Sequence, residues 1–206
     1  METNCWNIFP IEYINDLKKI SRNILFHKGD LVFQEEDMFK GFYLVHSGVL
    51  KLNRISYQGK ESILKIAEHG HLIGVPFFLV GDTTYPISLE ALEYSSLYYF
   101  EKSITDCLIQ KFPVIRNILM TISLKYLLYL QEKTISLMQD TLNERLLKYL
   151  SEIGARENYI KLTIKKNQIA LLLNASPEAI SRSFRFLTLN NQITEKDETY
   201  KIEFKS

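Results

Sequence analysis

The 206-residue sequence predicts an α+β protein: an N-terminal antiparallel β domain, a long helix and a C-terminal winged helix–turn–helix domain. Three observations predict this class. Short apolar runs separated by glycine turns occupy residues 24–100, residues 103–153 contain no glycine, and residues 167–190 hold two helical patterns joined by a tight break. We therefore expect domains at residues 1–112, 113–139 and 140–206.

The composition is that of a globular chain, with 46% hydrophobic residues. Lys plus Arg number 25 and Asp plus Glu 24, so the net charge of +1 argues neither for nor against a nucleic-acid partner. The two cysteines give no disulfide framework or zinc spacing. We see no signal-peptide pattern and no apolar run near the ~20 residues of a membrane span, so we expect a cytoplasmic protein without a membrane partner.

The first half of the chain has the texture of a β domain that follows a short helical lead-in at residues 6–20. Residues 49–55 (VLKLNRI) alternate between apolar and polar side chains, as strands do. Turn sequences recur at Lys28-Gly29-Asp30, Ser47-Gly48, Gln58-Gly59-Lys60, His69-Gly70-His71 and Gly81-Asp82. Many short strands at this spacing predict an antiparallel sandwich or barrel.

A long helix is expected next, because Phe112-Pro113 marks a helix boundary and residues 114–138 are apolar around most of their circumference. Its length is about 35 Å at 1.5 Å per residue. One apolar stripe approximates a heptad and predicts a dimer helix formed by Ile115, Ile118, Ile122, Tyr126 and Tyr129. A second stripe contains Leu124, Leu127, Leu128, Ile135 and Met138. The alternative is a central helix buried in a monomer.

The C-terminal third predicts a winged helix–turn–helix. Asp140-Thr141 forms a hinge before a helix at residues 142–153, which Gly154 ends. A strand at 159–163, a bracing helix at 165–173, a second helix at 176–189 and a hairpin of residues 193–196 and 200–204 follow. Ser176 and Pro177 begin the second helix as N-cap and first-turn proline.

The second helix carries the residues we expect to read DNA bases. Ile180, Phe184 and Leu187 form its buried stripe, and Glu178, Ser181 and Arg182 lie off that stripe. Arg182 can bond guanine O6 and N7, Glu178 can accept from cytosine N4, and Ser181 can contact a thymine or adenine edge. The alternative for Glu178 is an acid that only stabilises the positive helix end. Candidate phosphate contacts are Thr163, Lys165, Lys166, Ser176, Ser183 and Arg185.

Several segments resemble the CRP/FNR transcription regulators. KGDLVFQEED, FYLVHSGVLKL and GKESILKIAEHGHLIG are similar to their jelly-roll effector domain, and ASPEAISRSFRFL is similar to the recognition segment of the FNR branch. Glu36 departs from the pattern, because family members often carry glycine there. The resemblance implies a homodimer on double-stranded DNA with an inverted TTGA-like half-site, and RNA polymerase as a partner if the protein activates transcription.

The resemblance does not extend to the known ligands of the effector domain. The position of the ribose-binding glutamate falls on Val75, and that of the phosphate-binding Arg-Ser pair falls near Tyr85-Pro86. Leu130 and Gln131 replace the hydroxyl residues that reach adenine, so we expect no cyclic AMP. Val75, Phe77, Phe78 and Tyr85 form either an apolar effector pocket or a packed core.

The residues that could bind an iron–sulfur cluster or haem do not identify the effector either. Cys5 and Cys107 cannot supply the four ligands of an iron–sulfur cluster. His27, His46, His69 and His71 keep a haem-based gas or redox sensor open as an alternative. A second alternative is a regulator whose β domain is only a dimerisation scaffold. The sequence contains no phosphate loop, nucleophile motif or metal cluster, so we expect no enzyme and no catalytic or metal-binding residues.

Overall fold

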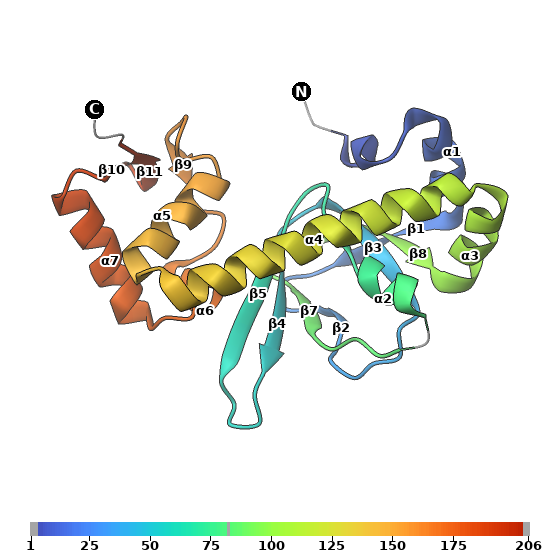
Figure 1. Ribbon diagram of the computed structural model, residues 1–206, viewed down its shortest axis with the longest axis horizontal. Helices are drawn as coiled ribbons and strands as arrows, with labels where there is room; N and C mark the ends of the chain where they lie inside the picture. Colours follow the sequence, from blue (N-terminus) through green and yellow to red (C-terminus); the bar gives the residue numbers. More distant parts are fainter. Residues whose placement is uncertain (1–3, 82, 204–206) are drawn as a thin grey trace. The chain divides into compact units, whose positions relative to one another are not determined.

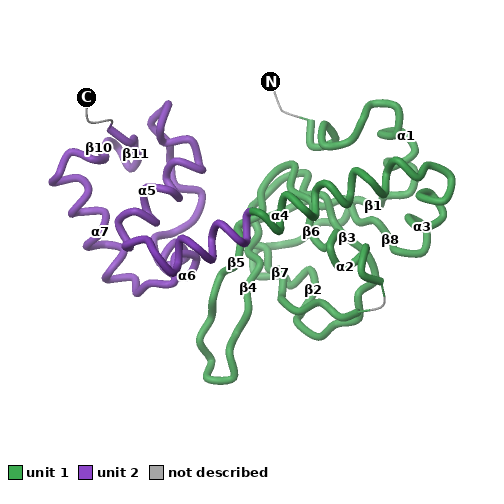
Figure 2. The backbone as a smooth tube through the Cα atoms, viewed as in Figure 1, with its two compact units in different colours: residues 1–128 green, residues 129–206 purple. Residues whose placement is uncertain are grey.

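The computed structural model describes residues 4–81 and 83–203, and the chain divides into two compact units, residues 1–128 and 129–206 (Figure 2). The division falls inside the long helix α4 (Pro113–Gln139). The predicted α+β class, with antiparallel sheets and a C-terminal helix–turn–helix, is confirmed (Figure 1). Asp82, expected in a turn, and Phe204, expected in the last strand, lie outside the described residues.

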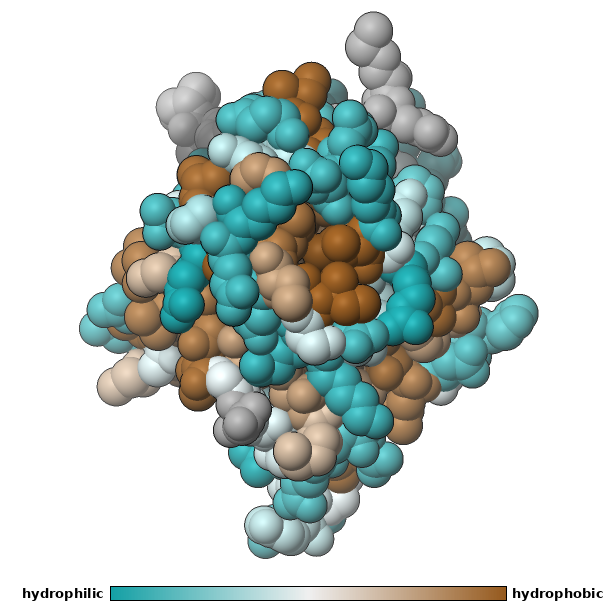
Figure 3. Space-filling view, turned by 90° about the vertical axis from the view of Figure 1, so that its right-hand side faces the viewer, coloured by the Kyte–Doolittle hydropathy of each residue, from teal (hydrophilic) through white to brown (hydrophobic). Residues whose placement is uncertain are grey.

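Unit 1 is built on two four-stranded antiparallel sheets. The first has the order β1-β8-β3-β6, and the second has the order β2-β7-β4-β5. Their bounds are β1 (Ser21–Phe26), β2 (Leu31–Phe33), β3 (Gly41–Ser47), β4 (Leu50–Ile55), β5 (Glu61–Ala67), β6 (Leu72–Ile73), β7 (Ser88–Ala91) and β8 (Ser95–Glu101). Apolar residues of the strands form one core, with Phe42, Leu50, Leu89 and Phe100 among its fully buried side chains, and β3 is buried at five consecutive positions. On the face of unit 1 drawn in Figure 3, hydrophobic residues gather in a hollow that hydrophilic residues surround.

The N-terminal lead-in closes one side of this core. It consists of a 3₁₀ turn, η1 (Cys5–Ile8), and a helix, α1 (Ile11–Ile20). Trp6 is buried, and its ring centroid lies 4.7 Å from that of Tyr98. The lead-in is therefore a packed part of unit 1.

The positive φ angles of Gly48 and Glu36 illustrate why particular residues stand in the turns of unit 1. Gly48 has a φ of +95°, and a Cβ atom there would lie 2.2 Å from the Ser95 hydroxyl oxygen, so only glycine fits. Glu36 also adopts a positive φ, 72°. The glutamate that replaces a family glycine thus keeps the left-handed backbone that glycine favours, at a cost in strain.

Three helices complete unit 1: α2 (Val75–Val80), α3 (Lys102–Lys111) and the first part of α4. Pro113 is the first residue of α4, as the sequence predicts. Within the described residues, no single helix combines the length and apolar character needed to cross a membrane; only α3 and α4 taken together, bent by 119°, reach that composition.

Unit 2 contains the end of α4 and a three-helix bundle with a small sheet. Its elements are α5 (Leu142–Glu152), β9 (Ile160–Lys161), α6 (Lys166–Leu172), α7 (Pro177–Leu189), β10 (Ile193–Lys196) and β11 (Thr199–Ile202). The sheet has the order β10-β11-β9 and is antiparallel. Leu146, Leu150, Ile169, Ile180 and Leu187 are fully or almost fully buried between the helices. This is the predicted winged helix–turn–helix.

Side-chain caps begin the helices of unit 2 where the sequence indicates. Thr141 and Glu144 form a reciprocal capping box at α5, in which the Thr141 backbone N–H donates to the Glu144 carboxylate at 2.7 Å. The Ser176 hydroxyl accepts from the backbone N–H of Ala179 at 3.2 Å and begins α7. Asn174, in the tight break before α7, has a φ of 51°. These local contacts fix the start of the helix that carries the candidate site.

Candidate nucleic-acid interface

The three predicted base-reading residues lie together on the exposed face of α7. Glu178, Ser181 and Arg182 are exposed, whereas Ile180 and Phe184 on the opposite face are buried. The i, i+3, i+4 spacing places the three side chains next to one another in the first two turns of the helix. An exposed polar face at the start of the second helix is the geometry that enters a major groove in helix–turn–helix proteins.

The carboxylate of Glu178 is held in its ionised form. Its pKa is lowered by hydrogen bonding to its own backbone N–H, then by the Ser176 hydroxyl and the nearby Arg182 charge. An ionised carboxylate is an acceptor only, which is the chemistry needed for cytosine N4. The same contacts also fit the alternative, in which Glu178 only stabilises the positive end of α7. One side chain can perform both roles.

Ser181 is exposed but has an intrahelical partner. Its hydroxyl donates to the backbone carbonyl of Pro177 at 3.0 Å. A serine hydroxyl retains its acceptor lone pairs in this arrangement and can rotate its donor to another acceptor. The side chain is therefore able to contact a base edge.

The predicted phosphate contacts fall into two groups. Thr163, Lys165, Ser176 and Arg185 are exposed on unit 2. Lys166 is half-buried, and its ammonium nitrogen lies 4.6 Å from the ring centroid of Phe184 and 5.4 Å from that of Tyr200. Its charge is thus already engaged by two aromatic rings.

Ser183 differs from the expectation. It is 4% exposed, and its hydroxyl donates to the side-chain oxygen of Asn143 on α5. The spacing of three residues from Ile180 places Ser183 at the edge of the buried stripe, and packing against α5 draws it inside. Ser183 therefore leaves the set of candidate phosphate contacts. Asn143, which sequence reasoning missed, is its partner and positions α7 against α5.

The structure contradicts part of the predicted dimer stripe of α4. Ile115 is fully buried in the core of unit 1, and so is Leu119. Ile118, Ile122, Tyr126 and Tyr129 are half-buried. The second stripe is the exposed one; its apolar members are Leu124, Leu127, Leu128, Ile135 and Met138. The first stripe therefore packs in part on the chain's own core, and the second stripe is the one exposed to solvent.

The residues assigned to an effector pocket are mostly core residues. Val75, Phe78 and Tyr85 are buried in unit 1, and Phe77 packs against the same cluster. The ring of Tyr85 stacks on that of Phe33 with centroids 3.8 Å apart, and its hydroxyl donates to the Gly41 carbonyl at 2.6 Å. Burial raises the pKa of the Tyr85 hydroxyl. Leu130 and Gln131 lie on the part of α4 that belongs to unit 2.

Among the cysteine and histidine side chains, Cys5 and His46 lie close together. The Cys5 thiol lies 3.7 Å from Nδ1 of His46, and burial raises the pKa of the thiol. Burial and the nearby Lys65 charge lower the pKa of His71 to about 4. Across residues 4–81 and 83–203, no group of three or more His, Cys, Asp or Glu side chains is arranged to hold a metal ion.

Comparisons with known proteins agree with both units. Residues 24–112 match the family model of the cyclic nucleotide-binding domain. The transcriptional activator protein Anr of Pseudomonas protegens is 27% identical over 195 residues, which cover 91% of this chain and 78% of that protein. The Anr protein of Pseudomonas aeruginosa is 29% identical over 175 residues, which cover 81% of this chain and 70% of that protein. The fumarate and nitrate reduction regulatory protein of Escherichia coli is 27% identical over 170 residues, covering 79% and 67%.

Solved structures share the fold. FixK2 from Bradyrhizobium japonicum has a TM-score of 0.80 at 16% identity and covers 90% of this chain and 93% of its own. The c-di-GMP-responsive global regulator CLP of Xanthomonas campestris has a TM-score of 0.78 at 17% identity, covering 95% and 100%. At these identities the likeness concerns the fold alone.

Proposed function

The chain belongs to the CRP/FNR family of transcription regulators, and from this premise we propose that it is a homodimer that reads an inverted-repeat, TTGA-like DNA site. The observation that carries the proposal is the exposed Glu178-x-x-Ser181-Arg182 face of α7, in a helix–turn–helix whose opposite face is packed. As a DNA-binding regulator it acts in the cytoplasm, with RNA polymerase as a partner where it activates transcription.

The base-edge chemistry assigns a role to each side chain. Arg182 has a planar fork of N–H donors that matches guanine O6 and N7, and Glu178 accepts from cytosine N4. Thr163, Lys165, Ser176 and Arg185 position the helix on phosphates without reading sequence. Lys166 contributes less, because its ammonium packs on two aromatic rings.

The exposed stripe of α4 is the proposed dimer surface. Leu124, Leu128, Ile135 and Met138 recur at spacings of four, seven and three residues and are all exposed. Two copies of this stripe packed about a two-fold axis remove these side chains from water. Two-fold symmetry then presents two α7 helices to half-sites whose centres lie about two helical turns apart, at about 34–36 Å per turn.

The input signal is proposed to be neither cyclic AMP nor an iron–sulfur cluster. Val75 and Tyr85, at the positions of the nucleotide-binding residues, are buried in the apolar core. Cys5 and Cys107 are both free thiols, two where a cluster needs four ligands. The absorption spectrum of the purified protein distinguishes the alternatives, since a haem sensor has a strong Soret band and a ligand-independent scaffold has none.

The test compares Arg182→Ala with Arg185→Ala on a TTGA-type inverted repeat and on a scrambled duplex. Loss of the bidentate guanine contact should weaken binding to the specific site by about 1–3 kcal/mol and leave the scrambled duplex almost unaffected. Arg185→Ala, the control, should weaken both duplexes equally and reduce the salt slope by about 1. Equal loss on both duplexes in Arg182→Ala would contradict its assignment to a base.

A further inference from the structure

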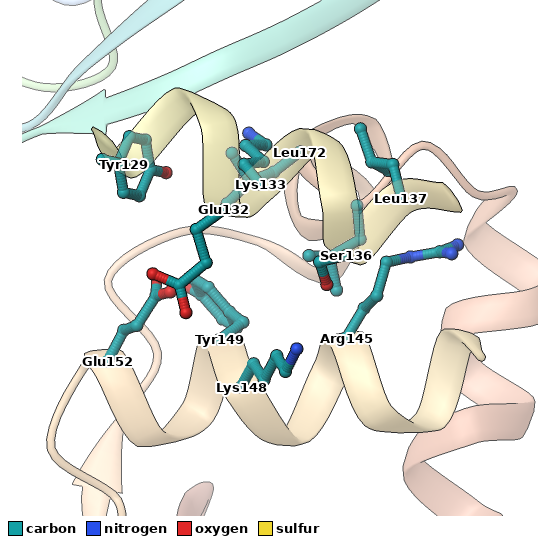
Figure 4. A pocket seen from close by; sticks show the side chains of 11 residues that line it. Tyr129, Glu132, Lys133, Ser136, Leu137, Arg145, Lys148, Tyr149, Glu152 and Leu172 are labelled. Atoms are coloured by element: carbon teal, nitrogen blue, oxygen red, sulfur yellow. The ribbon is translucent and has the colours of Figure 1, made fainter. Parts of the chain in front are cut away.

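A cavity with both charged and apolar walls lies within unit 2, between the end of α4 and α5 (Figure 4). It has a cavity volume of about 70 Å³ and is partly open to solvent. Two helical stripes with the same i, i+3, i+4, i+7 spacing face it, one from each helix. They are Tyr129, Glu132, Lys133 and Ser136 on α4, and Arg145, Lys148, Tyr149 and Glu152 on α5. Three leucines, Leu137, Leu172 and Leu173, complete the wall.

One end of the cavity is basic. Lys148 lies 2.5 Å from a carboxylate oxygen of Asp140, and the Ser136 hydroxyl donates to the same oxygen. Arg145 donates one guanidinium N–H to the Asp140 backbone carbonyl at 3.0 Å. Its Nε is buried and has no hydrogen-bond partner among the described residues. This end therefore has two cations and one carboxylate, a surplus of one positive charge, and a donor that lacks an acceptor.

The other end is acidic. The carboxylates of Glu132 and Glu152 are directed toward each other in Figure 4. Burial raises the pKa of Glu152, and the charge of Glu132 raises it further, whereas Lys133 opposes this. Burial lowers the pKa of Lys133 to about 8. Two carboxylates and one ammonium leave this end with a surplus of one negative charge.

We infer that this cavity binds a small zwitterion, an amino acid whose carboxylate lies at Arg145 and whose ammonium lies between Glu132 and Glu152. Such a ligand supplies an acceptor at the basic end and a cation at the acidic end. A simple anion would meet the two glutamates, and a simple amine would leave the Arg145 donor without an acceptor. The leucines provide an apolar wall for the carbon chain of the ligand.

The separation of the two ends sets the size of the ligand. Arg145 and Glu152 are seven residues apart on α5, about 10 Å at 1.5 Å per residue. The cavity thus favours an amino acid whose charges are separated by a few bonds over glycine.

Binding would also connect α4 to α5, and this consequence rests on the proposed function. The ligand contacts both helices on either side of Asp140, so it favours the arrangement in which they face each other. Since α5 packs against α7, an occupied cavity is expected to change the affinity for DNA.

The experiment measures binding to the full-length protein without DNA, by isothermal titration, for glycine, β-alanine, γ-aminobutyrate and 5-aminovalerate. Acetate carries only the negative charge of the proposed ligand and ethylamine only the positive charge, so these two probes test whether one charge is sufficient for binding. We expect saturable binding that passes through a maximum with chain length and exceeds that of both single-charge probes. No saturable binding of any zwitterion, or acetate binding as tightly, would overturn the inference.

Variants locate the site. Glu132→Gln changes an exposed side chain and should fold normally, yet weaken binding at least tenfold, about 1.4 kcal/mol. Arg145→Gln should have the same effect, with thermal unfolding as its folding check. Glu157→Gln, an exposed carboxylate of unit 2 away from the cavity, is the matched control and should bind as the unmodified protein does. Undiminished binding in Glu132→Gln would place the ligand elsewhere and refute the site.

A second measurement separates this inference from the proposed function. DNA affinity is titrated with and without the tightest amino acid. Binding of the amino acid without DNA binding would contradict the proposed function and leave the site standing. DNA affinity unchanged by a saturating amino acid would refute the regulatory consequence.

Discussion

Asn143 on α5 and Ser183 on α7 share a buried hydrogen bond. We expect substitution of Asn143 to lower the free energy of unfolding more than substitution of Ser183. In Asn143→Ala, the hydroxyl of Ser183, a side chain only 4% exposed, loses its acceptor inside the protein. An unsatisfied buried polar group costs about 1–3 kcal/mol. In Ser183→Ala the group left behind is the Asn143 amide, which is half-buried and can bond to water. That loss should be close to the net value of one hydrogen bond, about 0.5–1.5 kcal/mol.

The assay is urea unfolding of the full chain followed by two signals. Far-UV circular dichroism follows the helices of both units, whereas the fluorescence of the single tryptophan, Trp6, reports on unit 1 alone and serves as an internal control. We expect the helical transition to move to lower urea, more in Asn143→Ala than in Ser183→Ala, and to move little further in the double variant. If the losses of stability in the two single variants added up in the double variant, or if Ser183→Ala lost more than Asn143→Ala, the hydrogen bond would not be the cause of the destabilisation.

DNA binding provides an independent check on the same residue. If the Ser183 hydroxyl is directed at α5, Ser183→Ala should bind DNA with unchanged affinity and salt slope once corrected for the folded fraction. A reduced salt slope would mean that Ser183 contacts a phosphate after all.

Three further predictions test the junction, the long helix and the core. The Lys148 hydrogen bond, then that of Ser136, lowers the pKa of Asp140 from 3.8, so its stabilisation is present above that pH and lost as the pH falls through the folded value. Asp140→Asn should therefore melt earlier at neutral pH, and a difference that persists in strong acid would contradict the linkage. Fully buried Leu119→Ala should lose about 2–5 kcal/mol in urea unfolding, whereas Leu128→Glu, 63% exposed, should fold normally but sediment as a smaller species. Tyr85→Phe leaves the buried Gly41 carbonyl without its 2.6 Å partner and should cost about 1–3 kcal/mol; an unchanged urea midpoint would show that the bond contributes nothing.

The helix–turn–helix was predictable because its signals are local. Ser176 caps α7, Pro177 fits its first turn, and the apolar spacing within one helix indicates the face that packs. The strands and turns of unit 1 were predictable for the same reason, since glycines mark positions of positive φ. Even Glu36, a departure at the level of sequence, adopts the backbone that its position requires.

The faces of α4 could not be assigned from the sequence, because both of its stripes are apolar. Periodicity indicates that a face is buried but does not say what covers it. Ile115 and Leu128 are equally apolar in the sequence, yet the first is fully buried in unit 1 and the second is exposed. The decision depends on contacts with strands far away in the chain. Ser183 was misassigned for a related reason, because its partner Asn143 is 40 residues earlier in the chain.

Helix α5 contacts both the cavity and helix α7. One face, through Arg145, Lys148 and Glu152, lines the cavity, and another holds the recognition helix through the Asn143–Ser183 hydrogen bond. Ser183 directly follows Arg182, the residue assigned to guanine. A rotation of α5 about its axis would therefore move the residue that anchors α7 next to Arg182, the side chain proposed to read a base, because the two faces belong to one rigid helix. An input that acts at the junction of α4 and α5 would thus have a short physical route to the proposed DNA-reading surface.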